Sequence, residues 1–212
     1  HPLSIAFSDS WVKAVEEATN GRVKFTMHYG GSLVEGGSML QGVSSGIADA
    51  GWCPFAYFPG EMPLYNALAI CGFDWLNAKI ACYVNRDFIA AHPEGTPDEI
   101  VIMYVHSPAP GCLVTNKPIA TLEDIKGMQF RVDPLQSDGI AALGATPVAM
   151  TMPEAYEALS KNVIDGVLCN TEPLIGWNLY EITDYILETP FMYSSAPAVI
   201  FNKEKWNSLP AD

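Results

Sequence analysis

The sequence predicts an α/β protein of two lobes, each a largely parallel sheet flanked by helices, with a ligand cleft between the lobes. Short apolar segments alternate with amphipathic segments of about ten residues, which is the pattern of parallel sheets covered by helices. The length of 212 residues suits one large domain or two lobes, and the 49% hydrophobic content suffices for a buried core. A Pro-rich stretch at 107–111 marks a change of lobe. We therefore expect residues 1–110 and 196–212 to form the N-terminal lobe and 111–195 the C-terminal lobe.

The first half of the chain is expected to contain helices and strands of ordinary length. An apolar face over residues 9–20 predicts a helix that ends at Gly21. Apolar and polar residues alternate from Val23 to Tyr29, which predicts a half-buried strand. The other expected elements are a helix over 36–45, a strand over 47–52, a helix over 74–90 capped by Asp74, and a strand over 100–105.

The second half alternates strands and helices more regularly. Thr151, with Pro153 and Glu154 after it, opens one helix, and Asn202 caps the last one. The expected strands cover 112–115, 128–132, 146–150, 163–168, 185–187 and 198–201. Because ligands in such folds bind beyond the carboxyl ends of strands, residues at those ends are candidates for a binding site.

Charge and motifs exclude several classes of function. A net charge of −13 argues against partners such as nucleic acid or an anionic membrane surface, and an anionic ligand needs a local positive group. No apolar run reaches the roughly 18–20 residues of a membrane helix, so we expect no membrane insertion, and no signal peptide is recognisable. Metal, nucleotide and dinucleotide motifs are missing, so no cofactor, metal or catalytic residue is expected.

One catalytic alternative is a small α/β hydrolase. Residues 42–46 match the G-x-S-x-G pattern around Ser44. In hydrolases the serine lies on a turn from a strand into a helix, whereas Ser44 ends a helix that leads into a strand. We therefore expect Gly46 to stop the helix and Ser44 to have no catalytic role.

The cysteines show no metal or redox spacing and are expected to be core thiols. A bridge between Cys71 and Cys82 is left open by their spacing. The five cysteines are Cys53, Cys71, Cys82, Cys112 and Cys169.

Arg131 is the strongest candidate for a binding residue. It lies between Phe130 and Val132 in an apolar strand, where a charge needs a partner. That partner is either a carboxylate of the protein or the carboxylate of a ligand, which the planar guanidinium suits. An aromatic loop that includes Trp52 and Phe55 is either core or the apolar wall of a pocket.

Several segments, in order along nearly the whole chain, resemble the solute receptors of tripartite ATP-independent periplasmic (TRAP) transporters, of the dicarboxylate-receptor type. These segments are 19–24, 30–33, 45–49, 124–132, 144–147, 154–159 and 164–166. The resemblance implies a periplasmic binding protein of the type II-like class, with two lobes that close on a small organic acid. It also implies a periplasmic location, delivery to TRAP membrane permease subunits, and no enzymatic activity.

The resemblance also implies roles for individual residues. Arg131 corresponds to the carboxylate-binding arginine of the family, and Met152 to an apolar residue that faces the ligand. Cys169 or Asn170 corresponds to a position where an asparagine contacts the ligand. The N-lobe loop that touches the ligand is expected to supply Pro54 and Phe55, with Trp52 packing against the ligand's body.

The sequence departs from the family pattern in ways that bear on the ligand. Some members have a second arginine where this chain has Gly111 and Cys112, which favours a monocarboxylate with an apolar or aromatic body. The chain corresponds to about two-thirds of a receptor, so an incomplete N-terminal lobe is expected. A sensor domain with the same fold is a further alternative.

Overall fold

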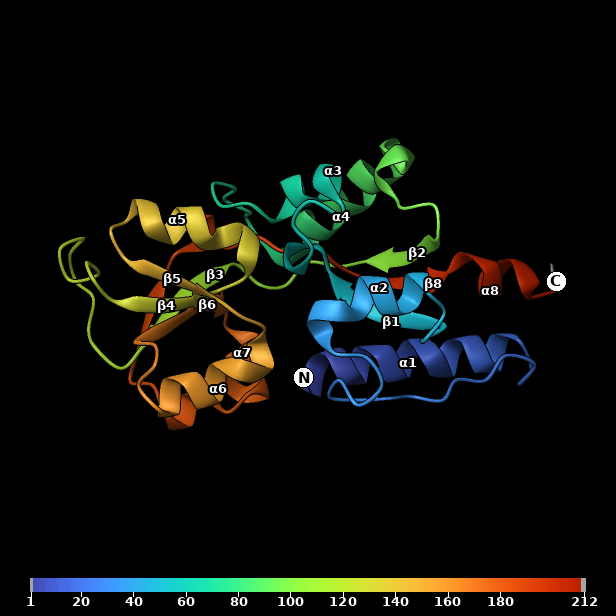
Figure 1. Ribbon diagram of the computed structural model, residues 1–212, viewed down its shortest axis with the longest axis horizontal. Helices are drawn as coiled ribbons and strands as arrows, with labels where there is room; N and C mark the ends of the chain where they lie inside the picture. Colours follow the sequence, from blue (N-terminus) through green and yellow to red (C-terminus); the bar gives the residue numbers. More distant parts are fainter. Residues whose placement is uncertain (1, 211–212) are drawn as a thin grey trace.

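The computed structural model describes residues 2–210, with side chains from residue 5 onward. The chain forms two lobes that lie side by side, each with a central sheet between helices (Figure 1). The polypeptide crosses between them more than once, because the last strand of the chain returns to the sheet that contains the first.

The N-terminal lobe contains a three-stranded sheet in the order β1-β8-β2. Its strands are β1 (Ala50–Pro54), β2 (Ile100–Val105) and β8 (Pro197–Asn202). The central strand, β8, is buried along its whole length and pairs antiparallel with both neighbours. Helices α3 and α4 lie on one side of this sheet and α1 and α2 on the other (Figure 1). The helices of this lobe are α1 (Pro2–Ala18), α2 (Met39–Ser44), α3 (Pro63–Asn66), α4 (Ala78–Ala91) and α8 (Lys203–Ser208).

The C-terminal lobe contains a five-stranded mixed sheet in the order β5-β4-β6-β3-β7. Its strands are β3 (Gly111–Thr115), β4 (Gln129–Val132), β5 (Thr146–Ala149), β6 (Gly166–Asn170) and β7 (Tyr185–Glu188). Helix α5 (Ser137–Ala142) covers one face, and α6 (Met152–Ser160) and α7 (Glu172–Gly176) cover the other (Figure 1). The strands of the N-terminal sheet thus come from both ends of the chain and those of the C-terminal sheet from its middle, and the lobe boundaries stay a prediction.

The sheets are less parallel than the sequence pattern predicted. Only β5, β4 and β6 run parallel, whereas β3 is antiparallel to both its neighbours and the N-terminal sheet is antiparallel throughout. The parallel strands are the ones joined by a helix within a single lobe. Where the chain arrives from the other lobe, as at β3 and β8, the alternation of strand and helix does not fix the strand's direction.

Three apolar clusters stabilise the lobes. One fills the N-terminal lobe around Phe55, Tyr65 and Ile200. The other two lie on opposite faces of the C-terminal sheet, one around Phe130 and the other around Val167. This division follows from the geometry of a strand, since successive side chains of β4 and β6 point to opposite faces of the sheet.

Signals from residues close together in the sequence predicted the ends of helices more accurately than the pairing of strands. The Glu154 carboxylate accepts the Thr151 N–H at 2.8 Å, and the Asn202 side chain caps α8, as expected. The cap of α4 is Asn77 rather than Asp74, so this helix begins three residues later than predicted. The segment from Val23 to Tyr29 is extended but pairs with no strand among residues 2–210, so the predicted strand is wrong.

Gly166 allows a close approach between β3, β4 and β6. A Cβ atom there would lie 2.7 Å from the Phe130 ring, from the Thr115 methyl group and from the Val114 carbonyl oxygen. We predict that Gly166→Ala lowers the free energy of unfolding by about 1–3 kcal/mol, because the backbone carbonyl cannot move aside without shifting the sheet. Urea denaturation measures the change.

Gly37→Ala is the matched control for this substitution. Gly37 is exposed, and its added Cβ atom would meet only the Thr151 methyl group, at 3.9 Å. Equal losses of stability in both variants would show that the tight contact at Gly166 is not the cause.

Candidate functional site

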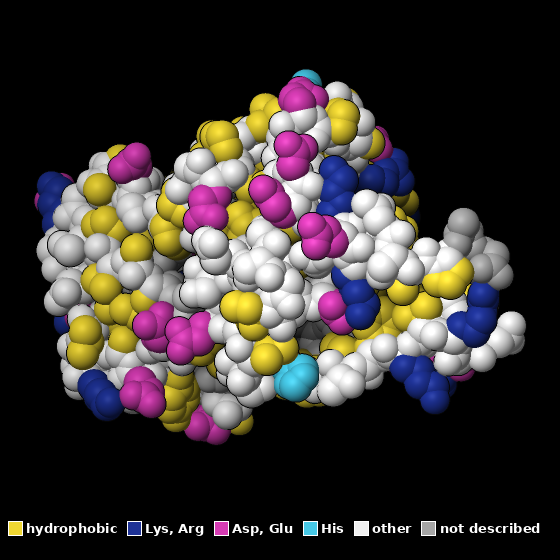
Figure 2. Space-filling view, turned by 45° about the vertical axis from the view of Figure 1, so that its right-hand side comes forward, with side chains coloured by type: hydrophobic (Ala, Val, Ile, Leu, Met, Phe, Trp, Pro, Cys, Tyr) yellow, Lys and Arg dark blue, Asp and Glu magenta, His cyan; other side chains and the backbone are white. Residues whose placement is uncertain are grey.

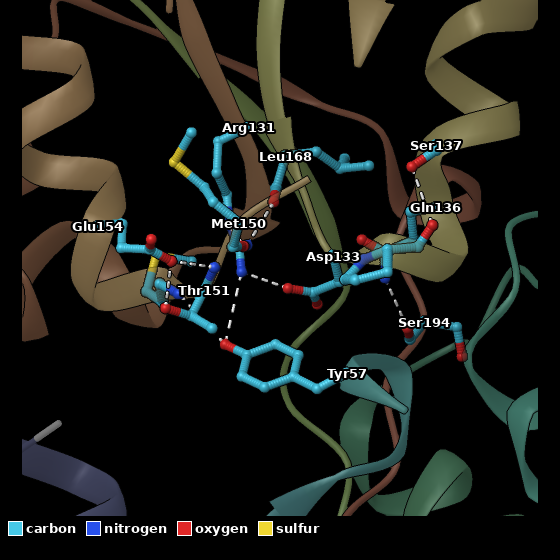
Figure 3. A network of polar contacts seen from close by, with 12 residues as sticks. Tyr57, Arg131, Asp133, Gln136, Ser137, Met150, Thr151, Glu154, Leu168 and Ser194 are labelled. Carbon is cyan, nitrogen blue, oxygen red and sulfur yellow. Dashed lines mark hydrogen bonds and ion pairs between the residues drawn. The ribbon is translucent and has the colours of Figure 1, made fainter. Parts of the chain in front are cut away.

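Arg131 lies at the junction of the two lobes, and its side chain is 1% exposed. The Nε group donates a hydrogen bond to the Met150 carbonyl at 2.9 Å, and Nη1 donates to the Leu168 carbonyl at 3.4 Å. Nη2 faces the Tyr57 hydroxyl at 3.5 Å and forms an ion pair with the Asp133 carboxylate. Figure 3 shows the guanidinium between Tyr57 on one side and Asp133 on another. Its hydrogen-bonding capacity is therefore largely used by the protein itself.

The ion pair with Asp133 supplies one of the two partners that the sequence left open for Arg131. The guanidinium is paired by a carboxylate of its own chain in this structure, and its contact with a ligand carboxylate stays a prediction. Asp133 follows β4 and lies two residues beyond Arg131, and residues spaced by two point to the same side of an extended chain. Asp133 is itself 3% exposed, so neither charge has water as its main partner.

Tyr57 connects the two lobes at this site. It belongs to a short 3₁₀ helix (Phe55–Tyr57) that follows β1 in the N-terminal lobe. Its hydroxyl accepts the backbone N–H of Met152, the first residue of α6, at 3.2 Å and also faces Arg131. The Tyr57 hydroxyl oxygen thus contacts both the Arg131 guanidinium and the first residue of α6 on the C-terminal side of the junction.

Burial and the ion pair together set the protonation of these groups. Burial favours the neutral form of Asp133 and raises its pKa above the ordinary value, although the Arg131 charge acts in the opposite direction. For Arg131, burial lowers the pKa, but the nearby Asp133 and Tyr57 outweigh it and the pKa is raised. Burial, followed by the Asp133 charge, also raises the pKa of Tyr57.

A second polar link joins the lobes beside this pair. Gln136 donates to the Ser194 carbonyl at 2.9 Å, and the Ser194 hydroxyl donates to the Leu68 carbonyl at 2.6 Å. The Trp75 indole donates to the Ser194 hydroxyl at 3.0 Å. Gln136 is fully buried, and its Oε1 atom has no hydrogen-bond partner among the described residues. The crossing segment around Ser194 is thus held by side chains from both lobes.

The remaining predicted site residues are placed as follows. Phe55 is buried and stacks on Tyr65 in the N-terminal core, next to the buried Pro54. Met152 begins α6, and its side chain joins the core cluster on the face of the C-terminal sheet that contains Cys169. The contacts of these four predicted residues with a ligand stay predictions.

Two other predicted residues, Asn170 and Trp52, make polar contacts of their own. The Asn170 side-chain oxygen accepts the Glu172 N–H at 3.2 Å. The Trp52 indole donates to His106 at 3.2 Å, and Trp52 is 37% exposed. Trp52 is therefore the most accessible of the predicted site residues, and its contact with a ligand also stays a prediction.

Sequence reasoning missed Asp133 and the hydroxyl of Tyr57 as parts of this site. For Asp133 a signal exists, since Arg-x-Asp in an extended segment places both charges on one side. For Tyr57 no local signal exists, because its partners are 74 and 95 residues away in the sequence.

The site is closed in this structure. Arg131 and Asp133 are 1% and 3% exposed. Access of a solute to Arg131 therefore requires the groups that cover it to move apart. Two hollows on the described surface lie elsewhere, one beside Ser44 and Asn202 and the other beside Pro63 and Gly95.

The sequence profile of the family described as "Bacterial extracellular solute-binding protein, family 7" (DctP) matches residues 1–71 and 112–212. The chain belongs to this family. The family consists of solute-binding receptors without enzymatic activity. Residues 72–111, which include α4 and β2, lie outside the matched region.

Solved structures and curated relatives of this family resemble the chain over most of its length. A TRAP solute-binding protein from a marine metagenome, in complex with metahydroxyphenylacetate, is 26% identical with a TM-score of 0.89, and covers 97% of this chain and 66% of its own. A TRAP protein from Bordetella bronchiseptica with bound mandelate is 27% identical with a TM-score of 0.84, and covers 95% and 65%. The sialic acid-binding periplasmic protein of Vibrio cholerae is 26% identical over 92% of this chain and 62% of the relative.

Relatives such as these are longer than the chain, which spans 60–66% of their length. The likeness confirms the predicted family and the two-lobe α/β fold. Ser44 ends α2 rather than forming a turn from a strand into a helix, so the hydrolase alternative gains no support. Within residues 2–210, none of the helices combines the length and the apolar character needed to cross a bilayer.

We predict that Tyr57→Phe destabilises the closed junction. The substitution leaves the Met152 N–H without its acceptor, which costs about 1–2 kcal/mol for a buried group. Urea denaturation should show this loss in the free energy of unfolding.

Tyr180→Phe is the matched control, since its hydroxyl donates to the adjacent Glu181 at 3.4 Å at an exposed position. This control should change stability by less than about 0.5 kcal/mol. A Tyr57→Phe variant as stable as the control would contradict the bridging role of the hydroxyl.

Proposed function

We propose that this chain is the ligand-binding part of a TRAP receptor that captures an organic monocarboxylate with an apolar or aromatic body and delivers it to a membrane permease. The observation that carries the proposal is the position of Arg131, a buried cation in contact with groups of both lobes. A ligand carboxylate at Arg131 would therefore hold the lobes together, which is how closure is linked to binding in two-lobe receptors.

In this proposal the ligand's carboxylate takes the place of Asp133 on Arg131. The planar guanidinium accommodates a carboxylate through two parallel hydrogen bonds, and the Asp133 ion pair demonstrates that the position accepts one. The incoming carboxylate gains the charge-assisted bonds that Asp133 gives up. Asp133 is then left buried beside a second negative charge, and protonation relieves this repulsion.

The relatives support an aromatic acid as the class of ligand. The marine metagenome protein is described as specific for aromatic acid ligands, and the Bordetella protein holds mandelate. Each of these ligands has one carboxylate and an aromatic ring. Some family members have a second arginine at the position where this chain has Gly111 and Cys112. The described C-terminal lobe therefore presents no second cation at that point.

The overall charge supports binding of an anionic ligand through one local cation rather than through the electrostatic field of the whole protein. The net charge is −13, and Figure 2 shows acidic side chains spread over the visible face of the molecule. The long-range field therefore repels an anion, and the contact with Arg131 has to supply the attraction at short range.

A screen by thermal shift tests the ligand class. We expect mandelate or 3-hydroxyphenylacetate at about 100 times the dissociation constant to raise the melting temperature by about 5–10 °C. Succinate and sialic acid serve as comparison ligands and should give smaller shifts. A larger shift with succinate than with any aromatic acid would contradict the monocarboxylate class.

Removing the guanidinium tests the role of Arg131. Because Arg131→Ala alone would strand Asp133 as an unpaired buried charge, the useful comparison is Asp133→Asn against the double variant Arg131→Met/Asp133→Asn. We predict that the double variant binds the best ligand about 30- to 1000-fold more weakly than Asp133→Asn, as expected for the loss of a charge-assisted contact. Calorimetry with equal affinities for both proteins would remove Arg131 from the site.

Proton uptake on binding tests the displacement of Asp133. Its pKa is already raised by burial, and losing Arg131 to a ligand carboxylate raises it further, so the bound state holds more protons than the free state. Between pH 5 and 8 affinity should therefore increase as pH falls, by at most about tenfold per pH unit for one proton. Asp133→Asn should bind more tightly and lose this pH dependence.

Asp138→Asn is the control for the proton measurement, since Asp138 is an exposed carboxylate of the same lobe. It should keep the pH dependence of the wild-type protein. Calorimetry in buffers of different ionisation enthalpy counts the protons directly, and a count of zero for the wild-type protein would contradict the displacement of Asp133.

A further inference from the structure

Cys112 and Cys169 face each other across two neighbouring antiparallel strands. The register of β3 and β6 pairs Cys112 directly with Cys169, so their side chains lie on the same face of the sheet. Both residues belong to the apolar cluster under α6 and are 1% and 0% exposed. Contact with the Cys112 thiol, together with burial, raises the pKa of the Cys169 thiol well above its ordinary value. The two sulfur atoms are thus close neighbours in a dry part of the lobe.

The Cα separation of this pair lies within the range found for disulfides, while its Cβ atoms, which are further apart in hydrogen-bonded pairs than the roughly 3.5–4.5 Å of a disulfide, have to approach each other through a small shift of the two strands. Asn116 lies four residues beyond Cys112, and in the register of β3 and β6 it stands opposite Asp165, four residues before Cys169. Asn116 donates its N–H to the Asp165 carbonyl at 3.4 Å, so these two residues form a hydrogen-bonded pair of the ladder. Pairs alternate along an antiparallel ladder, so Cys112 and Cys169 also form a hydrogen-bonded pair, for which the Cα atoms are about 5.5 Å apart. Disulfides are found at Cα separations of about 4.4–6.8 Å.

The other three cysteines have different surroundings. Cys71 donates from its thiol to the Met192 carbonyl, and the Cys82 sulfur accepts the Ser107 N–H at 3.0 Å. Cys53 is buried in the core of the N-terminal lobe. All five cysteines carry free thiols in this structure, and the bridge between Cys71 and Cys82 that the sequence left open is not formed.

We propose that Cys112 and Cys169 form a disulfide bond that joins β3 to β6 when the protein folds in an oxidising compartment. The family is extracellular, and disulfides form and persist in such compartments. Each thiol loses its hydrogen and the sulfur atoms bond to each other. The two electrons and two protons pass to the disulfide of an oxidised dithiol partner or of oxidised glutathione, which becomes two thiols.

The burial of both thiols fixes when this step takes place. An oxidant cannot reach side chains that are 1% and 0% exposed, so the bond forms during folding, before α6 covers the sheet. Once formed, it is shielded from reductants for the same reason. It also joins β3 to the strand that contains Leu168, whose carbonyl accepts a hydrogen bond from Arg131.

Mass spectrometry of protein exported to a bacterial periplasm tests this assignment. The protein is denatured in N-ethylmaleimide without reductant, and peptides are mapped before and after reduction. We expect Cys112 and Cys169 to resist alkylation and their peptides to be linked, so that at most three of the five thiols react. Alkylation of both residues, or linkage of either to another cysteine, would overturn the proposal. The wild-type protein alone decides the question, so no variant needs to fold.

A paired set of variants adds a second measurement. Cys112→Ala should free Cys169 for alkylation, whereas Cys71→Ala should keep the linkage. Reduction in denaturant followed by refolding in the presence of reductant should lower the melting temperature of wild-type protein and of Cys71→Ala by about 5–15 °C, because the bond closes a long loop in the unfolded chain. The melting temperature of Cys112→Ala should not respond to reductant, and a response equal to that of the wild-type protein would assign the effect to another bond.

Discussion

The ion pair between Arg131 and Asp133 is the interaction around which the junction of the lobes is arranged. Removing two charges from water costs several kcal/mol for each, and only close partners offset that cost. Here the partners are the Asp133 carboxylate, two backbone carbonyls of the C-terminal lobe and the Tyr57 hydroxyl of the N-terminal lobe. Because these groups come from separate elements, the position of one guanidinium determines how β4, the start of α6 and the loop after β1 meet.

In the proposed function, the same pair would let a strongly acidic protein bind an acid selectively. A free arginine in this position would attract any anion, including inorganic ones, whereas a paired arginine accepts only a ligand whose other contacts outweigh the carboxylate already present. In this proposal Asp133 would act as an internal competitor that sets a minimum for binding. Arg131 regains with the ligand the hydrogen bonds that it loses to Asp133, so the main cost of the exchange is that of leaving Asp133 buried without its partner.

The features that could be predicted from the sequence are those set by nearby residues. The capping box of Thr151 and Glu154, the cap at Asn202 and the apolar flanks that bury Arg131 depend on contacts a few residues apart. Strand direction in the N-terminal sheet depends on a strand that returns from the other end of the chain, and the segment from Val23 to Tyr29 alternates like a strand yet has none beside it. The Tyr57 contacts join residues far apart in the sequence, so no local pattern contains them.

In the proposed function, the burial of Arg131 has a kinetic consequence for solute capture. With 1% of the side chain exposed, an acid would be unable to dock first and draw the lobes together afterwards from the closed form. Capture would then wait for a spontaneous opening, so the observed rate of association would level off at high solute concentration, at the frequency with which the junction opens. The same barrier would retain a solute once it is enclosed between the lobes.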